Sequence, residues 1–194
     1  MESLWREYKA DVRRTFLRPP TTFWIAFGPI LHAGLRAVLI YRIAHRFYRV
    51  RALRFVSSIL KRLAFAVSGA EIHPSARFGP GLHLPHPLGI VIGPGVTADG
   101  EATIFQGVVL GPRGSDPTKV PHLGLHTFVY PGALVLGDVD VGPRTQIGAN
   151  VVVMRSLPAG TTVLPPEPII LEGLSFGLRF ESPSEVSQEA EAVK

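Results

Sequence analysis

Apolar residues recur every six positions over most of the second half of the chain. Stepping by six from Ile72 to Val108, and again from Leu123 to Val153, meets only apolar side chains. The two series are Ile72, Phe78, Leu84, Ile90, Val96, Ala102 and Val108, then Leu123, Val129, Val135, Val141, Ile147 and Val153. A six-residue unit fits one face of a parallel β-helix, a short strand followed by a turn, and three such faces form a coil of about 18 residues. A sandwich of short strands is the alternative, but its strands alternate with period two.

The six-residue series is interrupted once. Val108 and Leu123 lie 15 residues apart, which is not a multiple of six. We therefore expect residues 111–121, GPRGSDPTKVP, to leave the coil as an inserted loop. Insertions in solenoids commonly lie on a functional face.

A helical segment precedes the repeats. Residues 31–66 carry Leu, Ile and Phe at helical spacing with arginines between them, and prolines at positions 19, 20 and 29 break the chain upstream. We predict an α-helical N-terminal segment over 1–70, a β-helix domain over 71–168 and a C-terminal tail over 169–194. The tail is acidic and poor in apolar residues near its end, so we expect it to fray.

Composition narrows the chemistry. The 194 residues include no cysteine, which excludes disulfides, thiolate metal sites and a cysteine nucleophile. Residues 71–168 contain 15 Gly and 14 Pro, a composition that would indicate disorder without a period. With the six-residue period, these glycines and prolines are the turns of the solenoid.

The net charge of +5 is divided unevenly along the chain. Residues 1–70 carry +10 and residues 71–194 carry −5. No nucleic-acid-binding motif accompanies the basic segment, so we expect no nucleic acid partner. Arginines on helices usually form a solvated face, and the alternative is a membrane surface. The uncharged run from Pro19 to Leu35, with Phe23, Trp24 and Phe27, is short and broken for a spanning helix but suits an interfacial one.

The start of the chain, MESLWREYKADVRR, is polar and mixed in charge, which argues against a secretory signal peptide. The expected location is cytoplasmic, with peripheral contact to the inner face of the membrane through the basic helices.

Six segments carry a resemblance to a known family. They are YRIAHRFY (41–48), GAEIHPSARFGPG (69–81), HPLGIVIG (86–93), IFQGVVLG (104–111), GALVLGDVDVG (132–142) and IGANVVV (147–153). In order and spacing they resemble the serine acetyltransferase group of hexapeptide-repeat acyltransferases. The resemblance implies a mainly β protein with a left-handed parallel β-helix, acetyl-CoA as co-substrate, and a homotrimer or a dimer of trimers with sites between subunits.

The resemblance also assigns catalytic residues. The general base of the family matches His86, and the acidic residue that orients it matches Glu71, with the family's spacing of 15 residues. An imidazole with a pKa near 6.5 takes a proton at neutral pH, and a carboxylate on its other nitrogen fixes the tautomer. In an 18-residue coil, 15 residues would bring the two positions to nearly the same corner of adjacent turns.

The acetyl-CoA groove of the family matches residues of the loop and the later coils. These are Gly111, Gly114, Pro131, Gly132 and Ala149. Small residues there would let the pantetheine arm approach the backbone, and backbone N–H groups near the loop would stabilise a developing oxyanion. The C-terminal family motif is altered to PPEP at 165–168, losing an arginine that could meet CoA phosphates.

The acceptor site departs from the family pattern. Pro85 stands where the family has an aspartate before the base, Lys119-Val120 where it has Arg-His, and Pro19 or Pro20 where it has the aspartate of a helical motif. A free amino acid needs partners for its ammonium and its carboxylate, so these changes argue against L-serine as the acceptor.

The loop provides a second resemblance. GPRG at 111–114 followed by PHLG at 121–124 resembles colanic-acid-type acetyltransferases of exopolysaccharide synthesis. We therefore expect a sugar or exopolysaccharide hydroxyl as acceptor, with Arg113, Lys119 and His122 as candidate acceptor contacts. A serine O-acetyltransferase and a non-catalytic β-helix scaffold are the alternatives.

Metal binding is the remaining alternative for the histidines. His83 with His86, or His122 with His126, resembles part of the zinc site of β-helical carbonic anhydrases. That site needs three histidines in its own sequence contexts, which this chain lacks, so we expect no metal.

Overall fold

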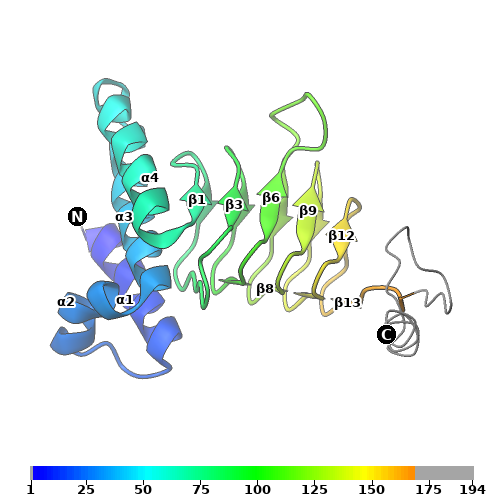
Figure 1. Cartoon of the computed structure of the whole chain (residues 1–194), viewed down its shortest axis with the longest axis horizontal. Helices are drawn as coiled ribbons and strands as arrows, with labels where there is room; N and C mark the ends of the chain where they lie inside the picture. Colours follow the sequence, from blue (N-terminus) through cyan, green and yellow to red (C-terminus); the bar gives the residue numbers. More distant parts are fainter. Residues whose placement is uncertain (1, 169–194) are drawn as a thin grey trace, which may run out of the picture.

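The computed structural model describes residues 2–168, and it places a group of helices at one end of a β-solenoid (Figure 1). The predicted C-terminal tail lies outside the described residues. The helices are α1 (Glu2–Phe16), α2 (Thr22–Leu31), α3 (Ala33–Tyr48) and α4 (Arg54–Ser68), with a short 3₁₀ turn η1 (Arg51–Leu53) before α4. They cover the N-terminal end of the solenoid, where an uncovered coil would expose its apolar interior.

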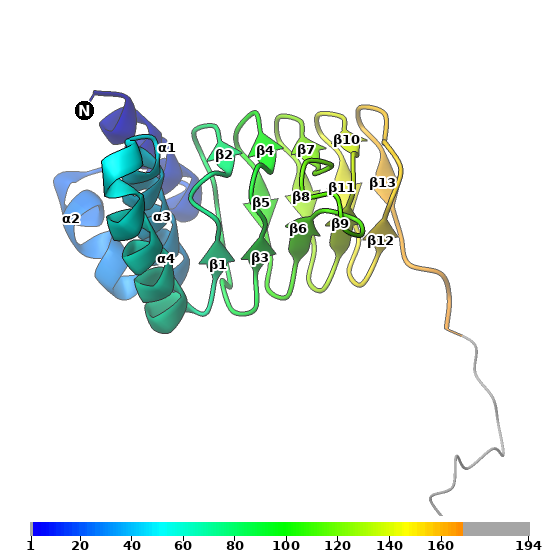
Figure 2. The ribbon, with the colours of Figure 1, turned by 90° about the horizontal axis from the view of Figure 1, so that it is seen from above.

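Short parallel strands stack into three sheets along the solenoid axis (Figure 2). They are β1 (Glu71–Ile72), β2 (Arg77–Phe78), β3 (Val91–Ile92), β4 (Thr97–Ala98), β5 (Thr103–Ile104), β6 (Val109–Gly111), β7 (His122–Leu123), β8 (Phe128–Val129), β9 (Leu134–Leu136), β10 (Asp140–Val141), β11 (Gln146–Ile147), β12 (Val152–Val153) and β13 (Thr162–Val163). We call the sheets A (β1-β3-β6-β9-β12), B (β2-β4-β7-β10) and C (β5-β8-β11-β13). The predicted parallel β-helix after a helical segment is confirmed.

The apolar positions of the six-residue series form the core of this solenoid. All thirteen are buried, and ten of them have no more than 1% of their surface exposed. Apolar side chains of successive coils therefore stack along the narrow interior, so each coil is stabilised through its neighbours.

The first coil is longer than the sequence pattern predicts. Ile72 stacks on Ile92, twenty residues later, and not on Ile90, whereas Ile92 stacks on Leu110 after eighteen. His83 already pairs with Thr103, so the two extra residues lie between Leu84 and β3. The assumption of an 18-residue first coil was wrong. Ile90 and Ile92 are both apolar and buried, so the six-residue count selected Ile90 although Ile92 is the residue that stacks on Ile72. The enlarged corner is the segment that carries His86.

The inserted loop leaves the solenoid between sheets A and B. β6 ends at Gly111 and β7 begins at His122, and the loop projects from the coils (Figure 1). Leu110 stacks on Val135, twenty-five residues later, so this coil holds seven residues more than an 18-residue coil. Gly111 itself remains buried in the strand, while Gly114 is exposed in the loop with φ +85°.

The YRIAH segment of α3 fastens the helices to the first coil. Tyr41 Oη donates to the carbonyl of Ala76 at 2.8 Å, Arg42 donates to the carbonyls of Phe78 and Gly79, and His45 Nδ1 donates to that of Pro74 at 2.8 Å. All of these acceptors are backbone oxygens of residues 74–79. The spacing within the motif thus has a structural use, because three side chains of one helix face satisfy carbonyls at the end of the solenoid.

A buried ion pair completes this joint. Both oxygens of Asp11 accept from Arg42, from Nε and Nη2 at 3.0 Å each, and Oδ1 also accepts from the backbone N–H groups of Gly81 and Leu82. Asp11 has no exposed surface and Arg42 is 3% exposed. Charges this deeply buried are tolerated only with full hydrogen bonding, which here connects α1, α3 and the first coil.

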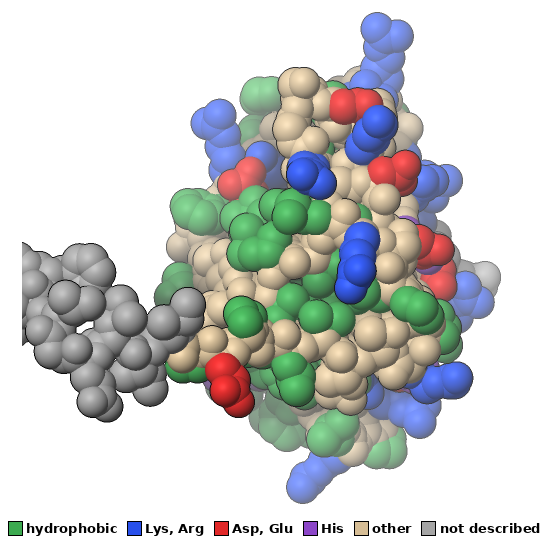
Figure 3. Space-filling model, turned by 90° about the vertical axis from the view of Figure 1, so that its right-hand side faces the viewer, with side chains coloured by type: hydrophobic (Ala, Val, Ile, Leu, Met, Phe, Trp, Pro, Cys, Tyr) green, Lys and Arg blue, Asp and Glu red, His purple; other side chains and the backbone are tan. Residues whose placement is uncertain are grey.

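The opposite end of the solenoid is more open within the described residues. Apolar side chains lie at its surface over the last coils (Figure 3), and Val152, Met154 and Leu164 are about half or more exposed. The helices therefore protect one end of the core only, as far as the described residues show.

Candidate active site

The predicted base, His86, lies on the enlarged corner between sheets C and A. It is exposed and stands between Pro85 and Pro87. Proline fixes its own φ and restricts the residue before it, so the two prolines limit the backbone on both sides of His86. The corner is further tied by Gly89 N–H to the carbonyl of Gly69 and by Gly107 N–H to the carbonyl of Leu88. His86 is thus presented to solvent on a rigid turn.

Two further histidines lie beside His86. His32 caps the start of α3 by accepting from Leu35 N–H through Nδ1 at 3.2 Å, and its ring centre is 6.5 Å from that of His83. Burial, together with the charges of His32, Arg14 and His86, lowers the pKa of His83 to about 4. Burial and the charge of His86 also lower the pKa of His32. Both neighbours are therefore neutral at pH 7.

Sequence reasoning did not assign roles to His32 or Arg14, and it weighed His83 only as a metal ligand. His83 lies three residues before His86 in LHLPH, so its proximity had a local signal. His32 and Arg14 come from the helices, and no pattern in the chain indicates that they approach this corner. Among the described residues, no group of three or more acidic or histidine side chains is arranged to hold a metal ion.

The predicted partner of His86 has a different contact in this structure. Glu71 Oε1 accepts from Lys61 Nζ of α4 at 2.8 Å. Among the hydrogen bonds and ion pairs within residues 2–168, none joins Glu71 to His86. The longer first coil gives the reason, since Glu71 pairs with Val91 and His86 lies five residues before that position. The orienting role of Glu71 therefore stays a prediction.

A row of tight turns runs along the same corner as His86. Gly89, Gly107, Gly132 and Asn150 occupy equivalent positions in successive coils, all with left-handed backbone at φ between 58° and 72°. The N–H of each bonds to a carbonyl one coil back, at 2.9–3.0 Å. We call residues 88–89, 106–107, 131–132 and 149–150 the turn ladder.

The turn ladder brings together four of the predicted site residues. Pro131, Gly132 and Ala149 lie on it, and His86 lies two residues before its first turn. With strands about 4.8 Å apart, the last turn of the ladder is about 14 Å from the first. The turn ladder therefore has the length to lie along an extended molecule that reaches His86 at one end.

The other predicted site residues lie away from the ladder in this single chain. Arg113, Gly114 and Lys119 are exposed in the inserted loop, which follows β6 at the opposite end of the sheet A strands. His122 begins β7, with Nδ1 2.9 Å from Thr97 Oγ1 and Nε2 3.5 Å from a carboxylate oxygen of Asp99. No hydrogen bond or ion pair within the described residues joins this group to His86.

The chain is similar to known enzymes over most of its length. It is 41% identical to the serine acetyltransferase of Helicobacter pylori over 136 residues, which cover 70% of this chain and 79% of that protein. The structure matches the serine acetyltransferase of Neisseria gonorrhoeae in complex with serine, with a TM-score of 0.76 and 27% identity over 87% of this chain and 70% of that one. No protein-family model matches the chain.

A third similar protein was solved in complex with coenzyme A. The serine acetyltransferase of Brucella abortus in complex with coenzyme A matches with a TM-score of 0.76 and 27% identity, covering 86% of this chain and 66% of that one. Since this likeness runs through both the helices and the solenoid, and the relative from Helicobacter pylori is covered over most of its own length, the chain belongs to the serine acetyltransferase family of left-handed β-helix, acetyl-CoA-dependent acyltransferases.

Proposed function

We propose that this protein transfers the acetyl group of acetyl-CoA to a hydroxyl, with His86 as the general base. The observation that carries the proposal is the exposed His86 at the head of the turn ladder, where Pro131, Gly132 and Ala149 also lie. Acetyl-CoA is an extended molecule that is long enough to lie along the ladder, and the small residues of the turns would let its arm approach the backbone.

The chemistry needs one proton to move out and back. Neutral His86 takes the hydroxyl proton as the acceptor oxygen forms a bond to the thioester carbonyl carbon. The carbon–sulfur bond then breaks, and the imidazolium returns the proton to the departing CoA sulfur. His32 and His83, both neutral at pH 7, do not place a positive charge beside the imidazolium that forms.

L-serine is the acceptor that the comparisons support. The relatives are named serine acetyltransferases, and one similar structure contains serine. They favour serine over the sugar acceptor expected from the sequence, and the likeness to colanic-acid-type enzymes stays a prediction. A sugar hydroxyl is the second candidate, because Pro85 and Val120 offer no charge to an amino acid at two positions where the family has polar side chains.

Release of CoA thiol on addition of acceptor tests both points. L-serine and a panel of nucleotide- and lipid-linked sugars are compared by kcat/KM, and turnover of serine alone supports the first candidate. His86→Ala is expected to lower kcat on the order of 100- to 10,000-fold. His126→Asn is the matched control, because this exposed histidine is paired with Glu101 and asparagine tolerates its left-handed backbone.

The rival to an enzyme is a β-helix scaffold without activity. Wild type that binds no CoA and shows no difference from His86→Ala would support the scaffold and contradict the proposal. CoA binding with no turnover of any acceptor in the panel would show that the true acceptor is missing from the panel.

We also propose that copies of the chain associate through sheet A. Its outward side chains are apolar from β3 onward, namely Val91, Val109, Leu134 and Val152, and Val91 and Val152 are 40% and 51% exposed. A second copy on this face would cover these apolar side chains. Light scattering after size exclusion should show a trimer or hexamer for wild type and a smaller species for Val91→Glu/Val152→Glu.

A further inference from the structure

The most apolar of the described helices is largely exposed. α2 has the sequence TFWIAFGPIL, without a charged residue, and of its ten described residues Gly28 alone is buried. Phe23, Phe27, Ile30 and Leu31 are each 50–68% exposed. α3, by contrast, buries seven of its sixteen residues. A helix that is apolar all round normally lies inside a protein or a membrane, so this exposure needs a partner.

α2 is nevertheless held firmly in place. Tyr8 Oη of α1 donates to the carbonyl of Ile25 at 2.9 Å, and Arg36 Nη1 of α3 donates to the carbonyls of Pro29 and Ile30 at 3.2 Å each. These bonds reach the backbone of α2 and do not cover its side chains. Trp24 and Ile25 also pack against the buried cluster of Tyr8, Val12 and Leu35. The neighbouring helices therefore fix the position of α2 while the four exposed apolar side chains face outward.

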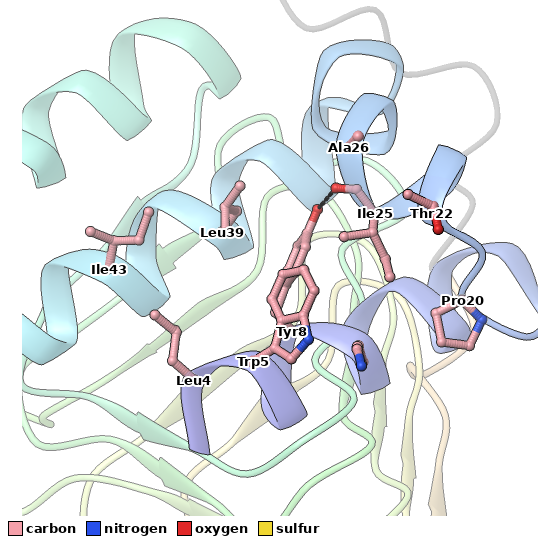
Figure 4. A pocket seen from close by; sticks show the side chains of 10 residues that line it. Leu4, Trp5, Tyr8, Pro20, Thr22, Ile25, Ala26, Leu39 and Ile43 are labelled. Atoms are coloured by element: carbon pink, nitrogen blue, oxygen red, sulfur yellow. Dashed lines mark hydrogen bonds between the residues drawn. The ribbon is translucent and has the colours of Figure 1, made fainter. Parts of the chain in front are cut away.

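An apolar groove extends the surface of α2. It lies between α1, α2 and α3 (Figure 4) and has a volume of about 750 Å³. Its lining includes Trp5, Ile25, Leu39 and Ile43, and Lys9 is the one charged residue among the lining side chains. The groove and the exposed residues of α2 form one apolar region at the end of the molecule away from the solenoid.

Basic side chains lie beside this region at the connection from α1 to α2. Residues 12–70 contain eleven Lys and Arg and no Asp or Glu. Arg13 and Arg18 line a hollow at the connection from α1 to α2, and Leu17 beside them is 82% exposed. A partner for this surface must therefore combine an apolar interior with a negatively charged face, which is the chemistry of an anionic lipid bilayer.

The dimensions favour a helix lying in the membrane interface. Ten helical residues span about 15 Å, half of the roughly 30 Å hydrocarbon core. Among the described residues, no single helix has the length and hydropathy of a membrane span; α2 and α3 meet those criteria only together, and they bend by 103° at their junction. Because α3 is fastened to the first coil by Tyr41 and Arg42, it is not free to enter a bilayer.

We propose that α2 docks the protein on an anionic membrane surface, with Phe23, Phe27, Ile30 and Leu31 inserted at the level of the acyl chains and Arg13 and Arg18 against the headgroups. Docking by α2 leaves the turn ladder on the solenoid open to solvent. The enzyme would then carry out the transfer at the membrane surface.

Co-sedimentation of the full chain with vesicles tests this proposal. Wild type is measured with phosphatidylglycerol–phosphatidylcholine vesicles and with pure phosphatidylcholine vesicles, at low and high salt. Phe23→Glu/Phe27→Glu removes the inserted rings, and Leu164→Glu, at the other end of the solenoid and 73% exposed, is the matched control. Circular dichroism and light scattering on each variant report folding and oligomer mass.

Wild type and Leu164→Glu should bind anionic vesicles, bind neutral ones weakly, and lose affinity as salt screens the headgroup charge. The double variant should bind on the order of 100-fold more weakly at unchanged oligomer mass. Absence of wild-type binding, or equal binding by the double variant, would overturn the proposal. A smaller oligomer for the double variant would assign α2 to a contact between copies and overturn it as well. His86→Ala should bind vesicles like wild type, so failure of the catalytic proposal is distinguishable.

Discussion

Asp11→Asn should weaken the joint between helices and solenoid more than any other single charge change on α1. The carboxylate receives four hydrogen bonds, two from Arg42 and two from the backbone of Gly81 and Leu82, and it has no exposed surface. An asparagine keeps the shape but turns one acceptor into an NH₂ group and leaves the guanidinium buried without its counter-charge. Removal of one partner from a buried pair costs about 3–5 kcal/mol of unfolding free energy.

Urea unfolding followed by circular dichroism, at one protein concentration, measures this loss. With a slope of about 2 kcal/mol per molar urea, the midpoint should fall by about 1.5–2.5 M. Glu7→Gln is the control, because Glu7 lies one turn earlier on α1 and pairs with Arg42 and Arg46 at 3.4 and 3.1 Å while 22% exposed. A partly exposed pair of this kind contributes about 1 kcal/mol or less.

Equal midpoints for Asp11→Asn and Glu7→Gln would refute the reasoning, because the buried network would then add nothing beyond a surface pair. A further arm repeats Asp11→Asn in an Arg42→Met background. Without the guanidinium, Asp11→Asn no longer leaves a buried positive charge unpaired, so it should lower the free energy of unfolding by less than in wild type. Purely additive losses would contradict direct coupling between the two charges.

Three other predictions concern the corner that carries the base. Gly34→Ala should lower the thermal midpoint and the free energy of unfolding by about 1–3 kcal/mol, because a Cβ there overlaps the carbonyl oxygen of Leu84. At an unhindered helical site the same substitution would raise the free energy of unfolding by about 1 kcal/mol, so a raised midpoint would contradict the packing. The pKa of His83 is lowered to about 4, so as pH drops the unfolded chain takes up this proton before the folded chain does. The free energy of unfolding should therefore fall as pH drops from about 6.5 towards 4. His83→Gln should flatten that part of the curve of thermal midpoint against pH, and an unchanged curve would count against a role for His83. If Glu71 orients His86 during turnover, Glu71→Gln should lower kcat on the order of 100-fold at constant KM for acetyl-CoA, whereas full activity would leave Lys61 as its partner.

Much of the solenoid follows from local sequence. A narrow coil admits roughly one apolar side chain per face, so the core repeats every six residues and the thirteen predicted positions are all buried. The break between Val108 and Leu123 marks the inserted loop for the same reason, since a loop outside the coil has no interior position to fill. The family was also accessible from motif order and spacing, and the same motifs predict His86 as the base.

Tertiary structure alone decided how these parts meet. The first coil takes twenty residues. The sequence pattern does not show this, because Ile90 and Ile92 both suit the interior and a six-residue count does not distinguish them. The approach of His32 and Arg14 to the corner of His83 depends on helices docked across long chain separations. Likewise, the apolar sequence of α2 is equally typical of a core helix. Only its packing shows that Phe23, Phe27, Ile30 and Leu31 face outward. Whether a side chain is buried depends on which two surfaces pack together. Local sequence indicates the character of each surface, but their packing depends on contacts between residues far apart in the chain.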